Sequence, residues 1–358
     1  MNEYLNQLFL DDIPFLDVRA ESEFASGAFP LSTNIPILND DERHQVGICY
    51  QESGQDAAET LGRRLVSGDT RANRVNEWIK YVESNANAHL YCWRGGKRSG
   101  IAVDWLREAG YEIPRIEGGY KSLRNALLER FRHLPRFLLL SGNTGVGKTD
   151  LILSVENSID LEGCANHRGS AFGKRVMPQP SQVDFENAVA IDLLKTRPAP
   201  FIVLEDESRL IGRIQIPYEL KNAMDASPVV ILREPKEQRV ERIRRDYILS
   251  QYDDLYDLHG ESAIDYLSDQ LLSATDAIRK RLGGVKHDKV KKLMNKALSQ
   301  HAAGKLDAHR EWIDFLLNEY YDPMYDYQID KKRERVLFSG SRAEIMDWLA
   351  EKAADSEF

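Results

Sequence analysis

Cysteine is scarce in this sequence, and the cysteines that occur are far apart. The 358 residues contain three of them, Cys49, Cys92 and Cys164. An odd number at such wide spacing predicts neither a disulfide framework nor a CxxC-type metal site, so we assign no metal ligands. This usage is typical of a reducing compartment, where a single cysteine can act as a thiolate nucleophile.

Long apolar runs are also missing. No stretch approaches the ~18 uncharged apolar residues that a membrane helix requires, and the first residues lack the basic region of a signal peptide. We therefore expect a cytoplasmic protein with no membrane partner. Hydrophobic residues make up 42% of the chain and charged residues 29%, which is typical of a soluble globular protein, and the length predicts two or three folding units.

A surplus of positive charge is absent too, since the net charge is -9. This argues against a protein whose whole surface binds nucleic acid. Residues 279–296, however, hold eight lysines and arginines and a single aspartate. Such a run forms either a solvated helix face or a surface that binds a polyanion. The candidate contacts are Lys289, Lys291 and Lys292, with Arg242 and Arg245 on a neighbouring predicted helix.

Strands and helices alternate along much of the chain, which predicts an α/β fold with parallel sheets covered by helices. The segments predicted as strands are residues 13–18, 88–91, 112–116, 136–142, 200–206, 227–234 and 335–339. A fresh strand begins just after Pro135, so we place one domain at residues 1–134 and a second at 135–358. Within the second domain, residues from about 235 to 325 are predicted to be almost entirely helical.

The first chemical motif is the loop CWRGGKRS at residues 92–99, between a predicted strand and a predicted helix. Loop N–H groups, the start of the helix and three cations would favour a thiolate at Cys92 and hold an anionic group beside it. We therefore predict Cys92 as a nucleophile, with Arg94, Lys97 and Arg98 as its catalytic cations. The other two cysteines lack such neighbours and are expected to be packing residues.

The second motif is GNTGVGKT at residues 142–149, a full match to the phosphate-binding loop (P-loop) G-x4-GK-[ST]. Its backbone N–H groups would hold a diphosphate, Lys148 would reach a terminal phosphate, and Thr149 would bind Mg²⁺ where the ligand brings one. A second-motif acid is expected at the end of the strand at 200–206. The predicted phosphate-binding residues are Gly142, Gly145, Val146, Gly147, Lys148, Thr149, Glu205 and Asp206.

A third segment, DLEGCANHRGSAFGK at residues 160–174, is polar and rich in glycine. Its glycines permit close approach of the backbone, and His167 and Arg168 supply donors to phosphates or bases. Taken alone, the segment is also compatible with an ordinary loop.

Two parts of the N-terminal domain resemble the rhodanese family: LDVRAESEFASGAFPLSTNIP at 16–36 and EGGYKSLR at 117–124. In rhodaneses the loop cysteine carries a persulfide. The spacing Cys-x5-Arg-Ser is one residue longer than the commonest rhodanese loop, and it also matches the cysteine phosphatase signature. Phosphatase loops generally have a histidine before the cysteine, whereas this chain has Tyr91.

The combination of both domains with CWRGGKRS, DLEGCANHRGSAFG and EYYDPMYDYQ (319–328) resembles the bacterial tRNA 2-selenouridine synthase family over nearly the whole chain. The resemblance implies an enzyme that replaces sulfur by selenium in 2-thiouridine at the wobble position of tRNA. It implies selenophosphate, supplied by its synthetase, as the selenium donor, and S-geranylation from geranyl diphosphate. The tRNA contacts would then be His167, Arg168, Arg242, Arg245, Lys289, Lys291 and Lys292.

Other interpretations stay open from the residues alone. One is a rhodanese-type sulfurtransferase fused to an ATP-using P-loop domain, and another is a cysteine phosphatase fused to such a domain. A third is a non-catalytic RNA-binding regulator that uses both loops to bind anions.

Overall fold

The computed structural model describes residues 2–354, which form two compact units. The first unit contains the chain up to His133 together with Ser181–Lys195, and the second contains Leu134–Pro180 and the chain from Thr196 onward. The division after His133 lies one residue from the predicted boundary. The segment at 181–195, which was expected in the second domain, instead belongs to the first unit.

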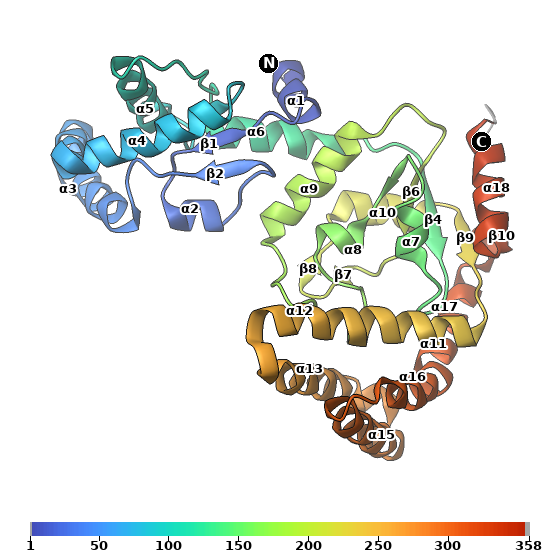
Figure 1. The fold of residues 1–358 in the computed structure, drawn as a ribbon. Helices are drawn as coiled ribbons and strands as arrows, with labels where there is room; N and C mark the ends of the chain where they lie inside the picture. The colour runs from blue at the N-terminus through green and yellow to red at the C-terminus, as the bar shows by residue number, and fades with distance from the viewer. Residues whose placement is uncertain (1, 355–358) are drawn as a thin grey trace. The chain divides into compact units, whose positions relative to one another are not determined.

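The first unit is a small parallel sheet with helices around it (Figure 1). Its elements are α1 (Asn2–Leu10), β1 (Phe15–Asp17), α2 (Glu21–Ala25), β2 (Ser32–Asn34), α3 (Asp40–Leu65), α4 (Gly68–Ser84), β3 (His89–Tyr91), α5 (Lys97–Glu108), α6 (Gly119–Leu128) and α9 (Gln182–Lys195). The strand order is β2-β1-β3, and Leu16 pairs with Thr33 on one side and Leu90 on the other. The predicted strand at 112–116 is reduced to a single bridge between Arg115 and Leu90.

Polar contacts explain why α9 belongs to the first unit. Asp184 accepts a hydrogen bond from the backbone N–H of Ala28 (2.7 Å), and the amide of Asn187 donates to the Ala28 carbonyl (2.6 Å). Arg124 on α6 donates to Asn187 Oδ1 (2.7 Å). Because Asn187 is fully buried, its two bonds, to Ala28 and Arg124, replace solvation that its side chain has lost.

The second unit is built on a five-stranded parallel sheet with the order β10-β9-β4-β6-β5. Its strands are β4 (Phe137–Ser141), β5 (Ser158–Ile159), β6 (Ile202–Glu205), β9 (Val229–Leu232) and β10 (Val336–Gly340), and a hairpin of β7 (Leu210–Ile211) and β8 (Ile214–Gln215) lies outside it. Its first helices are α7 (Lys148–Ile152), α8 (Leu161–Cys164) and α10 (Tyr218–Ala226), and α18 (Arg342–Ala353) ends the described chain. The central strand β4 is buried along its whole length, as expected for a strand covered on both faces.

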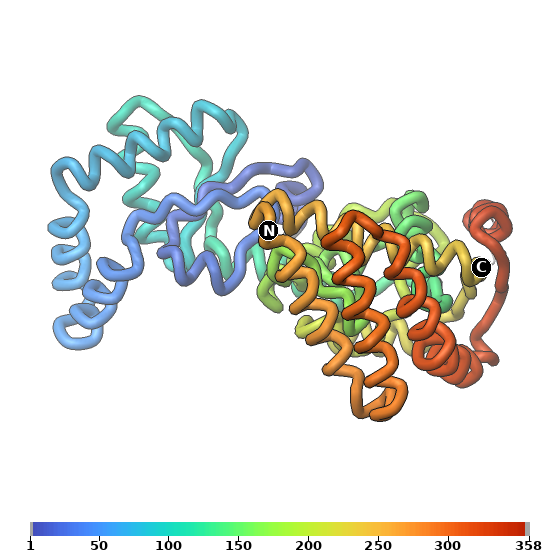
Figure 2. Tube along the Cα trace, turned by 60° about the horizontal axis from the view of Figure 1, so that its bottom comes forward, coloured from blue at the N-terminus to red at the C-terminus, as the bar shows by residue number. Residues whose placement is uncertain are grey.

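The predicted helical region forms a layer of its own on one side of this sheet (Figures 1 and 2). It consists of α11 (Lys236–Arg244), α12 (Ser250–His259), α13 (Ala263–Ala277), α14 (Arg279–Leu282), α15 (Gly284–Ala302), α16 (His309–Leu316) and α17 (Asp322–Lys331). Two π-helical turns, Arg245–Leu249 and Leu317–Tyr321, connect α11 to α12 and α16 to α17. The prediction of an α/β fold with parallel sheets and a largely helical C-terminal part is confirmed. No helix among residues 2–354 combines the length and the apolarity that a membrane crossing requires.

A buried histidine pair joins α15 to α16. Nδ1 of His301 lies 3.1 Å from Nε2 of His309, and the indole N–H of Trp312 donates to Nδ1 of His309 (3.0 Å). Since Nδ1 of His309 is occupied as an acceptor, neutral His309 carries its proton on Nε2 and donates it to His301. Burial and then the neighbouring His301 lower the pKa of His309 to about 4.

This pair predicts a loss of stability in mild acid. Below the unfolded pKa of about 6.5 the unfolded chain takes up a proton at His309 that the folded chain does not, so the free energy of unfolding falls until pH reaches about 4. The loss is on the order of 2 kcal/mol by pH 5. Urea unfolding followed by tryptophan fluorescence at pH 7.5 and 5 should show it, and His309→Gln should flatten the pH dependence. An equal pH dependence in the variant would contradict the assignment.

Candidate functional site

The P-loop of the second unit has the backbone that its glycines predict. It leaves β4 after Ser141 and enters α7 at Lys148. Gly145 (φ 81°) and Gly147 (φ 86°) are in the left-handed region. A Cβ on Gly145 would lie 2.8 Å from the side chain of Ile243, and one on Gly147 would lie 3.0 Å from the guanidinium of Arg242. Both positions therefore require glycine for conformation and for space.

Lys148 is the central cation of this loop. Its Nζ donates to the carbonyl of Gly142 (3.3 Å) and lies over the ring of Tyr325, 5.7 Å from the centroid. Burial lowers the pKa of Lys148, but interactions with Tyr325 and with nearby glutamates outweigh burial and raise its pKa above the ordinary value. Lys148 is therefore a fully charged ammonium in a half-buried position.

The carboxylate nearest to the P-loop threonine comes from α8. The hydroxyl of Thr149 donates to Oε2 of Glu162 (3.4 Å), and Glu162 hydrogen-bonds in turn to Glu207. Burial and the charge of Glu162 raise the pKa of Glu207 to about 8. Two buried carboxyl groups thus share this side of the pocket with the Lys148 ammonium.

The two predicted second-motif acids lie outside the pocket lining. Oε2 of Glu205 accepts hydrogen bonds from the backbone N–H groups of Leu161 (2.9 Å) and Glu162 (3.3 Å), so Glu205 holds α8 in place. Asp206 is ion-paired with Lys332 (2.5 Å). Glu162, which the sequence did not single out, takes the position facing Thr149.

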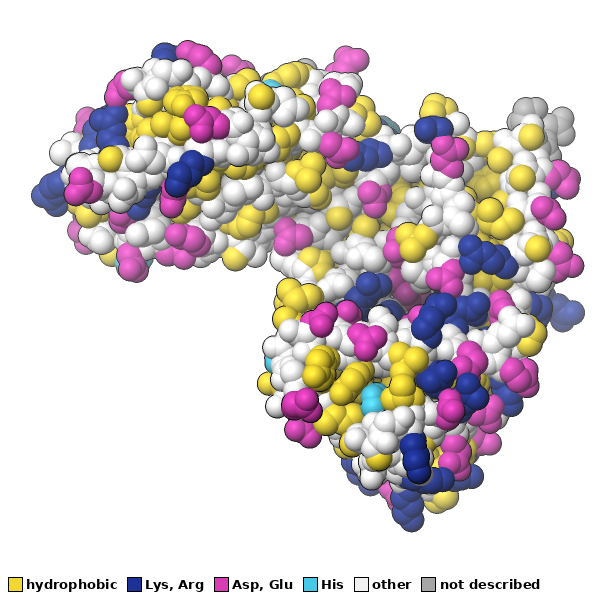
Figure 3. Space-filling view, viewed as in Figure 1, with side chains coloured by type: hydrophobic (Ala, Val, Ile, Leu, Met, Phe, Trp, Pro, Cys, Tyr) yellow, Lys and Arg dark blue, Asp and Glu magenta, His cyan; other side chains and the backbone are white. Residues whose placement is uncertain are grey.

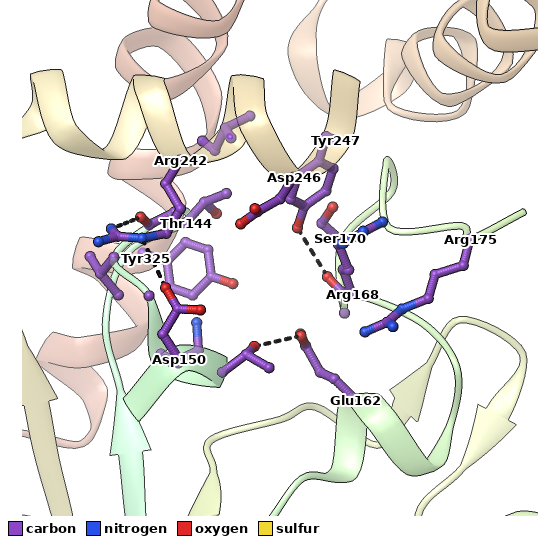
Figure 4. Close-up of a pocket in the computed structure, with 17 residues that line it drawn as sticks. Thr144, Asp150, Glu162, Arg168, Ser170, Arg175, Arg242, Asp246, Tyr247 and Tyr325 are labelled. Atoms are coloured by element: carbon purple, nitrogen blue, oxygen red, sulfur yellow. Dashed lines mark hydrogen bonds and ion pairs between the residues drawn. The ribbon is translucent and has the colours of Figure 1, made fainter. Parts of the chain in front are cut away.

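Figure 4 shows the pocket in front of the P-loop. Residues 144–150 line one side, and Arg168, Ser170 and Arg175 line the other. Four residues of α11 and the turn after it, together with Tyr325, complete the wall: Arg242, Ile243, Asp246 and Tyr247. Arg242 donates to the carbonyl of Gly145 (2.7 Å) and is ion-paired with Asp150 (3.3 Å). The pocket thus joins the P-loop to the glycine-rich segment at 160–174, as the two sequence motifs would need in order to act on one ligand.

The remaining predicted RNA contacts are divided between this pocket and other surfaces. Arg168 and Arg242 line the pocket. His167 is buried beside it, and its Nδ1 has no hydrogen-bond partner among the described residues. Arg245 is more than half exposed and ion-paired with Asp246 (2.6 Å).

The three candidate lysines lie on α15, which contributes nothing to the pocket. Lys289 lies over the ring of Phe315, 4.6 Å from its centroid, and Lys291 is ion-paired with Asp276 (3.0 Å). Over the helical layer, lysine and arginine side chains alternate with acidic ones on the face in Figure 3. Lys289 and Lys292 form no ion pair within residues 2–354, so their charges are more available than that of Lys291.

The cysteine loop of the first unit lies between β3 and α5, as predicted. Cys92 is 3% exposed, and its thiol donates a hydrogen bond to the hydroxyl of Ser99 (3.2 Å), which donates to the carbonyl of Gly96 (3.1 Å). Among the described residues no backbone N–H donates to the sulfur, so the expected convergence of loop amides on the thiol is not observed. The sulfur is covered and held by a hydroxyl.

The three loop cations have different surroundings. Arg98 makes two hydrogen bonds to Glu23 (2.5 and 3.0 Å), and Lys97 is ion-paired with Glu59. Arg94 is exposed, without a carboxylate within ion-pair distance in the described part of the chain. Two of the predicted cations are therefore ion-paired with glutamates from α2 and α3, each of which also pairs with a second arginine. The loop keeps a net positive charge, to which Arg94 and Arg115, which donates to the carbonyl of Gly96 (3.2 Å), also contribute.

The two segments that resemble rhodaneses, residues 16–36 and 117–124, pack beside the cysteine loop. Asp17 and Arg19 form a fully buried ion pair (2.6 Å), and the Arg19 guanidinium lies 4.0 Å from the ring centroid of Tyr120. Gly119 (φ 56°) lies so close to the carbonyl of Cys92 that a Cβ would overlap it. These contacts explain why the Asp-x-Arg motif and the glycine pair occur with the cysteine loop.

Comparison with known proteins decides the family. The family model described as tRNA 2-selenouridine synthase AAA domain matches residues 135–356. The tRNA 2-selenouridine synthase of Marinobacter nauticus (strain ATCC 700491 / DSM 11845 / VT8) is 47% identical, covering 97% of this chain and 96% of its own length. The protein of the same name from Azotobacter vinelandii (strain DJ / ATCC BAA-1303) is 48% identical at the same coverage. The chain belongs to the tRNA 2-selenouridine synthase family.

Membership of the tRNA 2-selenouridine synthase family confirms the resemblance stated from the sequence, and with it the prediction of an enzyme. Within this family member, the structure brings the P-loop together with Glu162, Ser170, Arg175, Tyr247 and Tyr325, none of which was predicted as a site residue. Glu162 and Ser170 lie in the segment DLEGCANHRGSAFG, and Tyr325 lies in EYYDPMYDYQ. The two sequence motifs thus contained these pocket residues, but the motifs did not show which of their side chains line the pocket.

Proposed function

We propose that this chain replaces sulfur by selenium in 2-thiouridine at the wobble position of tRNA, with selenophosphate, made by its synthetase, as the selenium donor. The proposal is carried by the relatives named tRNA 2-selenouridine synthase, which are similar over nearly the whole chain. It is supported by the presence of two distinct loops, one with a cysteine and one with a P-loop lysine, in the two units.

The P-loop pocket would bind the diphosphate of geranyl diphosphate. In this step the sulfur of 2-thiouridine attacks C1 of the geranyl group, the C–O bond to diphosphate breaks, and the base loses its N3 proton. The P-loop N–H groups and Lys148 offset the charge on the departing diphosphate. Thr149 and Glu162 present hard oxygen donors 3.4 Å apart and would hold a Mg²⁺ ion, which would neutralise part of that charge.

A small apolar crevice borders this pocket, and its volume of about 20 Å³ has room for about one water. Its side chains would therefore have to move apart to admit a geranyl chain. The crevice shares Thr144, Ser170, Ile243 and Tyr247 with the P-loop pocket. Its other walls are hydrophobic and come mainly from α16 and the π-helical turn after it: Phe172, Trp312, Ile313, Leu316, Leu317 and Tyr321. A diphosphate on the P-loop would place an attached apolar chain close to these side chains.

Cys92 and its loop would bind selenophosphate and supply selenium in the second step. S-alkylation converts the thiocarbonyl sulfur into a neutral thiol leaving group, so a selenium nucleophile can displace geranylthiol from C2 of the base. We assign to Cys92, on a rhodanese-like first unit, the release of that selenium: its thiolate attacks the phosphorus of selenophosphate, an S–P bond forms and the P–Se bond breaks, with Arg94, Lys97 and Arg98 around the anion. The released selenide attacks C2 of the base, and water hydrolyses the phosphocysteine to phosphate and free Cys92. Because the sulfur is covered at rest, the exposed loop at 93–95 must move before Cys92 can react.

Nucleoside mass spectrometry tests the proposal. Transfer RNA carrying wobble 2-thiouridine is incubated with the enzyme, selenophosphate and geranyl diphosphate, together and separately. We expect 2-geranylthiouridine with geranyl diphosphate alone, and 2-selenouridine with both donors. Neither product, or release of phosphate from aryl phosphates instead, would reject the function.

The lysines of α15 give a separate prediction for tRNA binding. Replacing Lys289, Lys291 and Lys292 together by alanine should weaken tRNA binding and lower the slope of log K against log salt by as much as about 0.9 for each phosphate that is no longer neutralised. Filter binding at four salt concentrations measures this slope. The triple lysine-to-arginine variant keeps the charges and should keep the slope. If the alanine variant matches wild type, this helix is only a solvated face.

A further inference from the structure

The segment after α8 folds back on itself and brings two arginines together. His167 and Lys174 form an antiparallel bridge, and the backbone N–H of Arg168 donates to the carbonyl of Gly173 (2.9 Å). A Cβ on Gly173 would lie 2.8 Å from the backbone of Arg168, so the turn closes only with glycine there. Arg168 and Arg175 follow the two bridge residues, and both line the pocket on the side across from the P-loop (Figure 4).

These two arginines lack the counter-charges that the other pocket cations have. Lys148 is balanced by Glu162 and Glu207, and Arg242 is ion-paired with Asp150. In the part of the chain that the structure describes, neither Arg168 nor Arg175 has a carboxylate within ion-pair distance.

The guanidiniums of this pair are also partly unsatisfied. Arg168 donates to the side-chain oxygen of Gln251 (3.4 Å), whereas Nε of Arg175 is buried with no acceptor among residues 2–354. Burial, and in part the like charge of Arg175, lower the pKa of Arg168. Two like charges that face a cavity, one of them with an unpaired buried N–H, are costly unless an anion joins them.

We propose that Arg168 and Arg175 bind a phosphodiester group of the tRNA, at a second anion site separate from the diphosphate site on the P-loop. Two planar guanidiniums match the oxygens of a phosphate well. The Arg168 guanidinium lies over the ring of Tyr247, 5.3 Å from its centroid, so an aromatic face is available beside the site for a nucleobase. A backbone phosphate held here would place a neighbouring nucleotide in front of the donor, as the reaction requires.

The inference rests on the proposed function, because it takes tRNA as the substrate. Its test compares two ligands, inorganic diphosphate and tRNA carrying 2-thiouridine, on the full-length chain. The variants are Arg168→Met, Arg175→Met and Arg175→Lys. Lys148→Ala is added because it should affect diphosphate binding and not tRNA binding. The matched control is Arg209→Met, which changes an exposed arginine outside the pocket lining.

Each methionine variant should weaken tRNA binding by about tenfold and lower the slope of log K against log salt by about one. Its affinity for diphosphate should stay within about twofold of wild type, which also shows that the pocket is folded. Lys148→Ala should lose diphosphate and keep most of its tRNA affinity, Arg175→Lys should keep the salt slope, and Arg209→Met should match wild type.

Two results would overturn the assignment. Unchanged tRNA binding in both methionine variants would reject it while leaving the proposed function intact. A loss of diphosphate affinity equal to the loss of tRNA affinity would place the arginines in the donor site instead. Failure of the wild-type chain to bind tRNA at all would reject the proposed function itself.

Discussion

Replacing Cys92 by serine should abolish selenium incorporation into tRNA while S-geranylation continues at its normal rate. The hydroxyl of serine is a far weaker nucleophile than a thiolate and would release little selenide from selenophosphate, so we expect the rate of 2-selenouridine formation to fall by at least about a thousandfold. We have proposed that geranylation uses the P-loop pocket of the other unit, and the lining of that pocket contains no cysteine. Mass spectrometry of nucleosides from the same reaction measures both products.

The control for this substitution is Cys49→Ser on α3, which lies outside the cysteine loop and should leave both products unchanged. A second variant, Ser99→Ala, removes the hydroxyl that accepts the Cys92 hydrogen bond without removing the thiol. It should alter the pH profile of selenation and leave geranylation alone. Normal selenation in Cys92→Ser would show that selenophosphate reacts without this cysteine, and the role of the loop would have to be abandoned.

The elements that could be predicted from the sequence are those with strong local patterns. The strands at 136–142, 200–206 and 227–234 were expected from apolar runs, and each contains an observed strand of the second sheet. The P-loop was equally visible, because its glycines are needed for local backbone reasons at Gly145 and Gly147. The sequence therefore predicted the elements whose conformation is set by neighbouring residues along the chain.

Other features depended on partners far along the chain. Arg98 and Lys97 were expected to charge the cysteine loop, but they form ion pairs with Glu23 and Glu59 on other helices. Residues 182–195 were expected in the domain at 135–358, yet this helix belongs to the first unit through contacts with Arg124 and Ala28. Such pairings follow from tertiary structure, which no spacing within a single motif reveals.

The carboxylate that faces the P-loop also could not be predicted from the sequence, because its position depends on tertiary contacts. Position in a strand suggested Glu205 or Asp206, since the end of such a strand commonly faces the phosphates. Here the buried Glu205 binds the backbone at the start of α8, and this presents Glu162 to Thr149 instead. The strand still supplies a carboxylate that the site needs, but it acts by positioning another residue.

Replacing Lys148 by alanine should abolish both geranylation and selenation, and this is the largest single effect expected in the second unit. Lys148 is a half-buried ammonium at the P-loop, so its loss removes the cation that offsets the leaving diphosphate and takes a counter-charge from the buried Glu162. We expect diphosphate affinity to fall by about a hundredfold or more and geranylation by at least as much. Isothermal titration with diphosphate and nucleoside mass spectrometry measure the two quantities.

Supplying tRNA that already carries 2-geranylthiouridine should restore selenation in this variant, because the remaining step belongs to Cys92. If the variant is folded but does not selenate that substrate, the two steps are not divided between the two loops as proposed. If the variant still geranylates tRNA, the diphosphate of the donor is bound elsewhere.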